Sequence, residues 1–340
     1  YTAKFPGQIS QDLHFARTVA ENLGIDLREI EIPYSNDAVA QLEKLSFQYD
    51  QPVPFAGTTL SESILYEAIA GDGVRVALTG TGGDEVFGGY GNEYIEAALT
   101  QLTAERDFIQ LGRSLSDAIS GKWTTLPAVG AYLRDRLKGA RPKNKMFMIL
   151  ASAAKGRFRA FIENCGIYYW AKDAFRIPLP ELQMYDSLHG RLASYVTFAD
   201  NNAMMSSIEA RCPFMDPNLA KYMHLPVRDK YKGDFNKYAL RTAMPDIVGQ
   251  SVIWRRGKQG FTYLFEQFYQ SNKAMIYDNI RQSPILNEMF DMPATLRAID
   301  GIPLHRDFVL HMFSLSKFCE FQECAFDATA LETAGSSLTP

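Results

Sequence analysis

The sequence predicts an α/β fold in which a parallel sheet with flanking helices is followed by a mostly helical second half. Strand and helix patterns alternate along residues 1–90, and apolar residues recur at helical spacing from about residue 91 onward. The alternating elements occupy residues 1–5, 10–23, 26–32, 37–48, 60–71 and 74–78. Strands separated by helices form mostly parallel sheets, because each connecting helix packs back onto the sheet.

Each element follows from a local pattern. The strand predicted at 26–32 reads DLREIEI, and the strand predicted at 74–78 reads VRVAL. The helix predicted at 60–71 repeats apolar residues three and four positions apart. Near the end, residues 305–326 form a clear amphipathic helical pattern.

These patterns divide the chain into three parts. We expect an α/β part at 1–100, a mostly helical remainder at 101–328 and a loose tail at 329–340. The tail has little apolar surface to bury, so nothing would hold it in place.

Composition indicates a globular protein. The 340 residues are 46% hydrophobic and 22% charged, and the net charge of −4 gives no general attraction to nucleic acid or to an anionic membrane. The longest apolar run, near 146–154, is about half of a membrane span. The four cysteines lack C-x-x-C spacing, which favours a reduced, cytoplasmic protein. Because the chain does not begin with Met, we expect it to start partway through a longer polypeptide.

The stretch VRVALTGTGGDEVFGGY at 74–90 carries the strongest functional signal. Its glycines let backbone N–H groups approach an anion closely, its threonines add hydroxyl donors, and its first acid can hold a divalent cation. The candidate residues are Thr79, Gly80, Thr81, Gly82, Gly83 and Asp84. Neither common nucleotide-binding fingerprint matches this spacing. Taken alone, the pattern also fits a corner whose glycines serve only the chain geometry.

Charged residues concentrate at 200–216, where Asp200, Glu209 and Arg211 lie among apolar residues. Unpaired buried charges are costly, so Glu209 and Arg211 must face a cleft or each other. A purely structural Glu–Arg pair is the alternative.

Positive charge gathers further along the chain. Lys237 and Arg241 are spaced i, i+4 on a predicted helix, and the loop at 254–261 carries Lys258 between two glycines. Such lysines can neutralise the charge that develops when pyrophosphate leaves. A solvated basic loop is the alternative.

Five motifs follow one another along nearly the whole chain: DQP at 50–52, LTGTGGDEVFGGY at 78–90, IEARCPFMD at 208–216, KYALR at 237–241 and RGKQGF at 256–261. In this order they resemble the synthetase domain of the glutamine-hydrolysing asparagine synthetase family, which includes β-lactam synthetases and lasso-peptide cyclases. One motif would be a weak signal, but the ordered set is specific.

The resemblance implies an ATP-pyrophosphatase fold, of the adenine nucleotide alpha hydrolase type, that binds ATP and Mg²⁺. It adenylates a carboxylate and lets an amine displace AMP. By resemblance, Thr79 and Gly80 contact the nucleotide, and Asp84 ligates magnesium. Lys237 and Lys258 hold the departing pyrophosphate, so Lys258→Ala should lower turnover far more than nucleotide affinity. Substrate-binding or supporting roles fall to Asp50, Asp200, Glu209, Arg211 and Arg241.

Three departures from the family pattern matter. The S-G-G-x-D-S loop and the glutaminase domain would lie upstream of Tyr1, so we expect this chain alone to lack ATP–pyrophosphate exchange. Thr81 stands where asparagine synthetases have an acid, and threonine is no acid or base near neutral pH. Ser194 and Tyr195 stand where many members have an acid before Asp200. Adenylation is therefore better specified than the carboxylate.

The leading hypothesis is asparagine synthesis, in which aspartate becomes β-aspartyl-AMP and is amidated by ammonia derived from glutamine. The partners would be small-molecule substrates, a glutaminase domain of the full-length chain and a second copy in a homodimer, with no nucleic acid and no membrane. One alternative is a related amidotransferase or cyclase that acts on a sugar acid, a peptide or an antibiotic precursor. Another is a non-catalytic nucleotide-binding module.

Overall fold

The computed structural model describes residues 1–7, 11–32, 38–53, 56–119, 129, 130, 133, 152–156, 158, 159, 177–233, 235–244, 247–256, 265–299 and 305–321. The predicted tail at 329–340 lies outside these residues. So does most of the predicted basic loop, from Gly257 onward, including Lys258.

Parallel strand pairs form the β part, as predicted. β1 (Thr2–Lys4) pairs with β2 (Glu29–Glu31), and β3 (Val76–Leu78) pairs with β4 (Glu209–Arg211). In the described residues these pairs are two separate two-stranded sheets. β4 was not predicted, although residues 208–212 alternate apolar and polar side chains, because this stretch was interpreted only as a cluster of charged residues.

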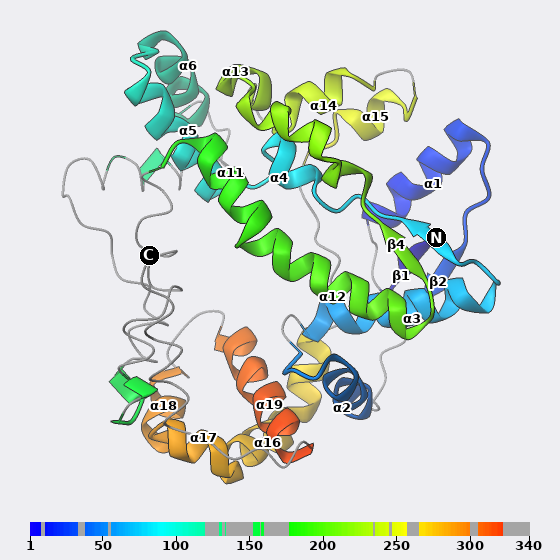
Figure 1. Ribbon diagram of the computed structural model, residues 1–340, viewed down its shortest axis with the longest axis vertical. Coiled ribbons are helices and arrows are strands. Elements are labelled where there is room, and N and C mark those ends of the chain that lie inside the picture. The colour runs from blue at the N-terminus through cyan, green and yellow to red at the C-terminus, as the bar shows by residue number, and fades with distance from the viewer. Residues whose placement is uncertain are drawn as a thin grey trace.

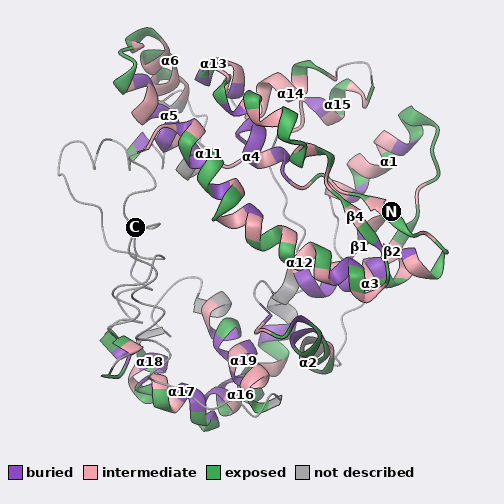
Figure 2. Ribbon diagram, viewed as in Figure 1, coloured by how far each residue is buried: buried purple, intermediate pink, exposed green. Residues whose placement is uncertain are grey.

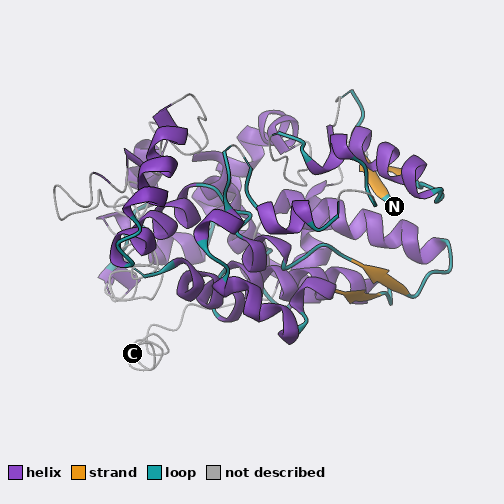
Figure 3. Cartoon of the chain, turned by 90° about the horizontal axis from the view of Figure 1, so that it is seen from above, coloured by secondary structure: helices purple, strands orange, loops and turns teal. Residues whose placement is uncertain are grey.

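Helices pack against both strand pairs and form most of the other described elements (Figures 1 and 3). The predicted N-terminal helices are confirmed as α1 (Gln11–Leu23), α2 (Ala38–Tyr49) and α3 (Ala56–Gly71). The predicted helix at 305–326 is α19 (His305–Phe321), and its remaining residues lie outside the described part. The other α-helices are α4 (Gly83–Phe87), α5 (Asn92–Ala104), α6 (Phe108–Ile119), α11 (Leu179–Leu188), α12 (Arg191–Met205), α13 (Val227–Lys230), α14 (Tyr238–Thr242), α15 (Gln250–Ile253), α16 (Phe265–Gln282), α17 (Pro284–Met289) and α18 (Met292–Ile299). Two 3₁₀ helices, η1 (Pro213–Met215) and η2 (Pro217–His224), follow β4. Among the described helices, none is both long enough and apolar enough to cross a bilayer.

Several separate hydrophobic cores stabilise the described part of the chain. The largest core joins α2, α3, α16 and α19, and it includes Leu45, Leu60 and Phe313. A second core lies between α5, α11 and the start of α13, where Tyr94 and Leu179 are fully buried. Figure 2 shows that the buried residues of these helices lie on the faces that meet. The second core holds α5 against α11, and α11 in turn packs beside the short helix α4.

Candidate functional site

The glycine-rich turn begins where β3 ends. The Thr79 amide donates to the Arg211 carbonyl over 2.9 Å, so the turn starts beside the end of β4. The Thr79 hydroxyl lies 3.1 Å from the Thr81 hydroxyl and 3.3 Å from the Cys212 sulfur. The two predicted threonines therefore lie together at the end of the strand pair.

Two glycines near the turn are required by geometry. Gly82 has a φ of 94°, and a Cβ there would lie 2.9 Å from the Met215 side chain. At Gly89, a Cβ would lie 1.6 Å from Oδ1 of Asp84. The backbone of Gly89 thus leaves room for the Asp84 carboxylate. A Cβ at Gly80, by contrast, would meet no atom of the described residues within 4 Å, so these residues leave the backbone there open to a ligand.

Asp84 and Lys237 form the charged centre of the site. Nζ of Lys237 lies 3.0 Å from Oδ1 of Asp84, and the two side chains are 29% and 26% exposed. Asp84 lies in the first turn of α4, whereas Lys237 precedes α14 with a positive φ of 51°. A partly buried pair is screened less by solvent than a surface pair. The structure thus brings together two of the predicted site residues.

Arg241 holds the segment that presents Lys237. Its Nε donates to the Asn236 carbonyl over 2.7 Å, and its Nη1 donates to the Ile253 carbonyl. Asn236 in turn donates from Nδ2 to the Gly89 carbonyl over 2.5 Å. Burial lowers the pKa of Arg241, with a smaller effect from Arg255. The guanidinium therefore acts as a structural tie, and the predicted i, i+4 relation to Lys237 is confirmed by their backbone hydrogen bond.

A buried polar layer lies under α4. Glu85 is almost fully buried, and it accepts a hydrogen bond from the Tyr90 hydroxyl over 2.6 Å. Burial raises the pKa of Glu85, and the Tyr90 hydrogen bond partly offsets this. Gln183 donates from Nε2 to the Val86 carbonyl over 3.1 Å, and Lys230 donates to Oε1 of Gln183 over 2.5 Å. These contacts fix the orientation of the helix that carries Asp84.

Sequence reasoning missed the residues of this layer. Gln183 and Lys230 lie outside the five motifs, and Lys230 stands in the run Arg-Asp-Lys-Tyr-Lys at 228–232, which is typical of a solvated surface segment. Glu85 and Tyr90 lie within the glycine-rich motif at 78–90. Their place in that motif was the only sequence feature that connected them with the site. Lys230 also has an unusual titration, because burial lowers its pKa to about 7.

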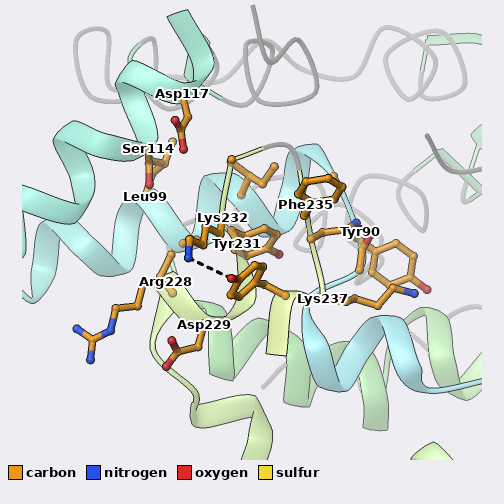
Figure 4. A pocket seen from close by; sticks show the side chains of 18 of the residues that line it. Tyr90, Leu99, Ser114, Asp117, Arg228, Asp229, Tyr231, Lys232, Phe235 and Lys237 are labelled. Atoms are coloured by element: carbon orange, nitrogen blue, oxygen red, sulfur yellow. Dashed lines mark hydrogen bonds between the residues drawn. The ribbon is translucent and has the colours of Figure 1, made fainter. Parts of the chain in front are cut away.

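A cavity of about 630 Å³ adjoins the Asp84–Lys237 pair. Residues of α5 and α6 line one side, and the segment from Val227 to Tyr238 lines the other. In Figure 4, Leu99 and Ser114 lie on the opposite side of the view from Lys237. The hydroxyl of Tyr231, another lining residue, is buried without a hydrogen-bond partner among the described residues. Its pKa is raised by burial and, to a lesser extent, by the charge of Asp84.

Four other predicted residues do not line this cavity, although the backbone of one of them, Arg211, adjoins the turn at Thr79. Glu209 and Arg211 face each other on β4, with Nε of the arginine 2.9 Å from Oε1 of the glutamate, and both are exposed. Asp200 is exposed on α12, and Asp50 is exposed at the end of α2 with a φ of 51°. Lys258, which was also predicted to belong to the site, lies outside the described residues.

A divalent cation could be held by Asp84. No group of three or more His, Cys, Asp or Glu residues suited to a metal occurs in the part of the chain that the structure describes. Mg²⁺ does not need such a group, because it is commonly bound by one or two carboxylates together with phosphate oxygens and water. The Asp84 carboxylate fits this mode, since the missing side chain at Gly89 leaves it space and its exposed fraction gives access.

Comparison with known proteins places these motifs in one family. The sequence profile of the asparagine synthase family matches residues 1–321. A Mycobacterium tuberculosis protein provisionally named asparagine synthetase [glutamine-hydrolyzing] is 25% identical over 88% of this chain and 46% of its own length. Asparagine synthetase [glutamine-hydrolyzing] 1 of Bacillus subtilis is 26% identical, over 77% of this chain and 42% of its own length. Amidase chry2 of Gibberella zeae is 24% identical over 74% of this chain and 41% of its own length. The chain thus spans less than half the length of these relatives.

Proposed function

Because this chain belongs to the asparagine synthase family, we propose that it is the synthetase part of an ATP-dependent, amide-forming ligase. A carboxylate oxygen of the substrate attacks the α-phosphorus of ATP, which forms an acyl-AMP and releases pyrophosphate. An amine then attacks the acyl carbon, loses a proton and displaces AMP, which leaves an amide. The proposal also includes the ATP-pyrophosphatase fold.

The observation that carries this proposal is the Asp84–Lys237 pair beside the glycine-rich turn. Magnesium bound at Asp84 would neutralise polyphosphate charge, as it does in other enzymes that act on nucleotides. The Lys237 ammonium forms an ion pair with Asp84 and carries three N–H donors, so it can also bind phosphate oxygens. Lys258 would act with it on pyrophosphate, and Thr79 and Gly80 would contact ATP. Preorganised charges of this kind lower the barrier for a leaving polyanion.

The identity of the carboxylate is the finer part of the proposal. Aspartate is the first candidate, with β-aspartyl-AMP as intermediate, glutamine-derived ammonia as nucleophile and asparagine as product. The names of two relatives support this choice. A specialised carboxylate is the second candidate, and Thr81, the cavity beside Lys237 and the relatives named amidases favour it. A glutaminase domain as nitrogen source and a homodimer are proposed on the family resemblance alone.

The experiment is ATP–pyrophosphate exchange by the full-length protein with a panel of carboxylates and Mg²⁺. Exchange that depends on one carboxylate supports adenylation and identifies the substrate. Exchange with none of them, although the folded protein binds ATP, would favour the non-catalytic nucleotide-binding module. Silence with aspartate alone would exclude asparagine synthesis but not the ligase chemistry.

A further inference from the structure

The segment that presents Lys237 has an unusual backbone conformation. Lys237 has a φ of 51° and a ψ of 36°, which lie in the left-handed region that residues other than glycine seldom adopt. Such a conformation persists where the surrounding structure fixes it. The place of the ammonium, 3.0 Å from Asp84, therefore depends on the contacts that the neighbouring residues make.

An indole ring packs against residues before and after Lys237. Trp254, which directly follows α15, contacts Phe235 edge-on, with ring centroids 5.1 Å apart and an interplanar angle of 74°. Trp254 also contacts Tyr238, with centroids 5.8 Å apart and an angle of 48°. Phe235 and Tyr238 flank Lys237 in the sequence, and α14 and α15 lie side by side (Figure 1). One side chain therefore packs on both flanks of the lysine.

Lys232 joins the two flanking aromatic residues to each other. Its backbone forms two hydrogen bonds with that of Phe235, of 3.0 and 3.1 Å. Its ammonium donates to the Tyr238 hydroxyl over 3.0 Å and lies 4.8 Å from the centroid of that ring. Phe235 and Tyr238 thus form one unit, and a contact that holds this unit also holds the lysine between them.

The indole is itself held in place. Nε1 of Trp254 donates to Oε1 of Gln250 over 2.8 Å. The carbonyl of Ile253, the residue before Trp254, accepts a hydrogen bond from Nη1 of Arg241. The Arg241 guanidinium also lies over the Phe235 ring, 5.5 Å from its centroid. The end of α15 is therefore joined to the lysine segment both by a hydrogen bond and by ring packing.

We infer that Trp254 is a positioning residue for Lys237. Its ring holds Phe235 and Tyr238, so that the ammonium stays beside Asp84. Trp254 is not among the described residues that line the cavity, so it acts through the segment that it holds rather than on a ligand. This inference rests on the proposed function, because it assigns the role of Trp254 through the ammonium that would bind pyrophosphate.

A double-mutant cycle separates positioning from general structural support. ATP–pyrophosphate exchange by the full-length protein would be measured for the wild type, Trp254→Ala, Lys237→Met and the double variant. We expect Trp254→Ala to lower kcat by about tenfold when Lys237 is present but by less than about twofold in Lys237→Met, because the ammonium that it places is then already absent. An equal loss in both backgrounds would overturn the inference, because Trp254 would then act on another part of the site.

Further variants show whether the ring packing itself matters. Trp254→Phe keeps an aromatic ring and should recover most of the rate. Tyr185→Ala is the matched control, because Tyr185 and His189 pack with the same centroid distance of 5.8 Å but do not line the cavity. It should leave exchange unchanged, and a loss as large as that of Trp254→Ala would contradict the inference. If circular dichroism shows that Trp254→Ala does not fold, Phe235→Leu takes its place in the cycle, since it removes the edge-on contact from the other side.

A binding measurement separates this inference from the proposed function. Isothermal titration calorimetry would measure the affinity of magnesium pyrophosphate for the same four full-length proteins. If no carboxylate supports exchange, the proposed function fails. The inference still holds in that case if Trp254→Ala weakens pyrophosphate binding only when Lys237 is present. Equal weakening in both backgrounds, or a wild type that binds no pyrophosphate, would contradict it.

Discussion

The ion pairs Asp84–Lys237 and Glu209–Arg211 have nearly equal lengths but different surroundings. The first spans 3.0 Å, with side chains 26% and 29% exposed, and the second spans 2.9 Å, with side chains 60% and 59% exposed. Both lie in motifs that suggest function. The first joins two segments distant in sequence beside a cavity, whereas the second joins neighbours on one short strand.

The difference shows what a charged motif requires to form a site. Asp84 is held by the space at Gly89, by the polar layer under α4 and by Lys237. Glu209 and Arg211 are held mainly by each other, and solvent and salt screen them. Preorganisation, rather than charge density, therefore separates the proposed site from a surface pair.

The largest effect is expected from Asp84→Asn. This change keeps the shape that fits against Gly89 but removes the charge that would bind magnesium. Pyrophosphate exchange by the full-length enzyme should fall by about 10³-fold. Titration with Mg²⁺ at fixed ATP measures the loss, and activity within a few fold of wild type would remove Asp84 from the site.

Lys237→Met should have the next largest effect. The change retains most of the side-chain length but removes the ammonium that faces Asp84. We expect turnover to fall by about 10²-fold while the dissociation constant of ATP changes less, because the charge on pyrophosphate grows as it leaves. Single-turnover kinetics together with nucleotide titration measure the two quantities. Equal losses in both would indicate simple nucleotide binding.

Gly89→Ala tests the cradle of the carboxylate. The new Cβ would lie 1.6 Å from Oδ1 of Asp84, so the carboxylate must move. We expect a loss of about 1–3 kcal/mol in the free energy of unfolding, together with reduced exchange. Urea denaturation measures the former. Gly80→Ala is the control for stability, because its Cβ would meet none of the described residues within 4 Å. An equal loss there would refute the steric account.

Lys230→Met tests the support under α4 through its pH dependence. Burial lowers the pKa of Lys230 to about 7 from its ordinary 10.5, so the unfolded chain binds more protons between these values. The free energy of unfolding should therefore rise with pH above 7 because of Lys230, by an amount on the order of 1 kcal/mol by pH 9. Denaturation at several pH values would show this slope in the wild type and its loss in Lys230→Met. Lys221→Met, at an exposed position, should keep the slope.

The smallest effect is expected from Arg211→Met. The guanidinium is exposed and its partner is two residues away, so its loss should leave the denaturation midpoint unchanged within error. A large shift would mean that this pair is structurally as important as the buried layer. Salt titration of the wild type provides the control, because a screened pair should respond to it.

The sequence predicted much of the first half of the fold for physical reasons. VRVAL and the helical patterns before it have clear periodicity, and they became β3, α2 and α3. β4 was missed although residues 208–212 alternate apolar and polar side chains, because the pattern is short and its two charges drew the functional interpretation. The ligand-binding roles of the glycines and Asp84 could be predicted from the chemistry of the residues themselves. That Lys237 lies in the same site could be predicted only from the family resemblance. Gln183 and Lys230 could not be found, since a buried hydrogen bond between distant segments leaves no local pattern.

The most direct test compares the two ion pairs in one assay. Pyrophosphate exchange with saturating Mg-ATP and the preferred carboxylate would be measured for full-length wild type, Lys237→Met and Arg211→Met. The account predicts a loss of about 10²-fold in the first variant and a rate within about threefold of wild type in the second. Equal rates in the two variants would contradict the assignment of the Asp84–Lys237 pair as the adenylating centre.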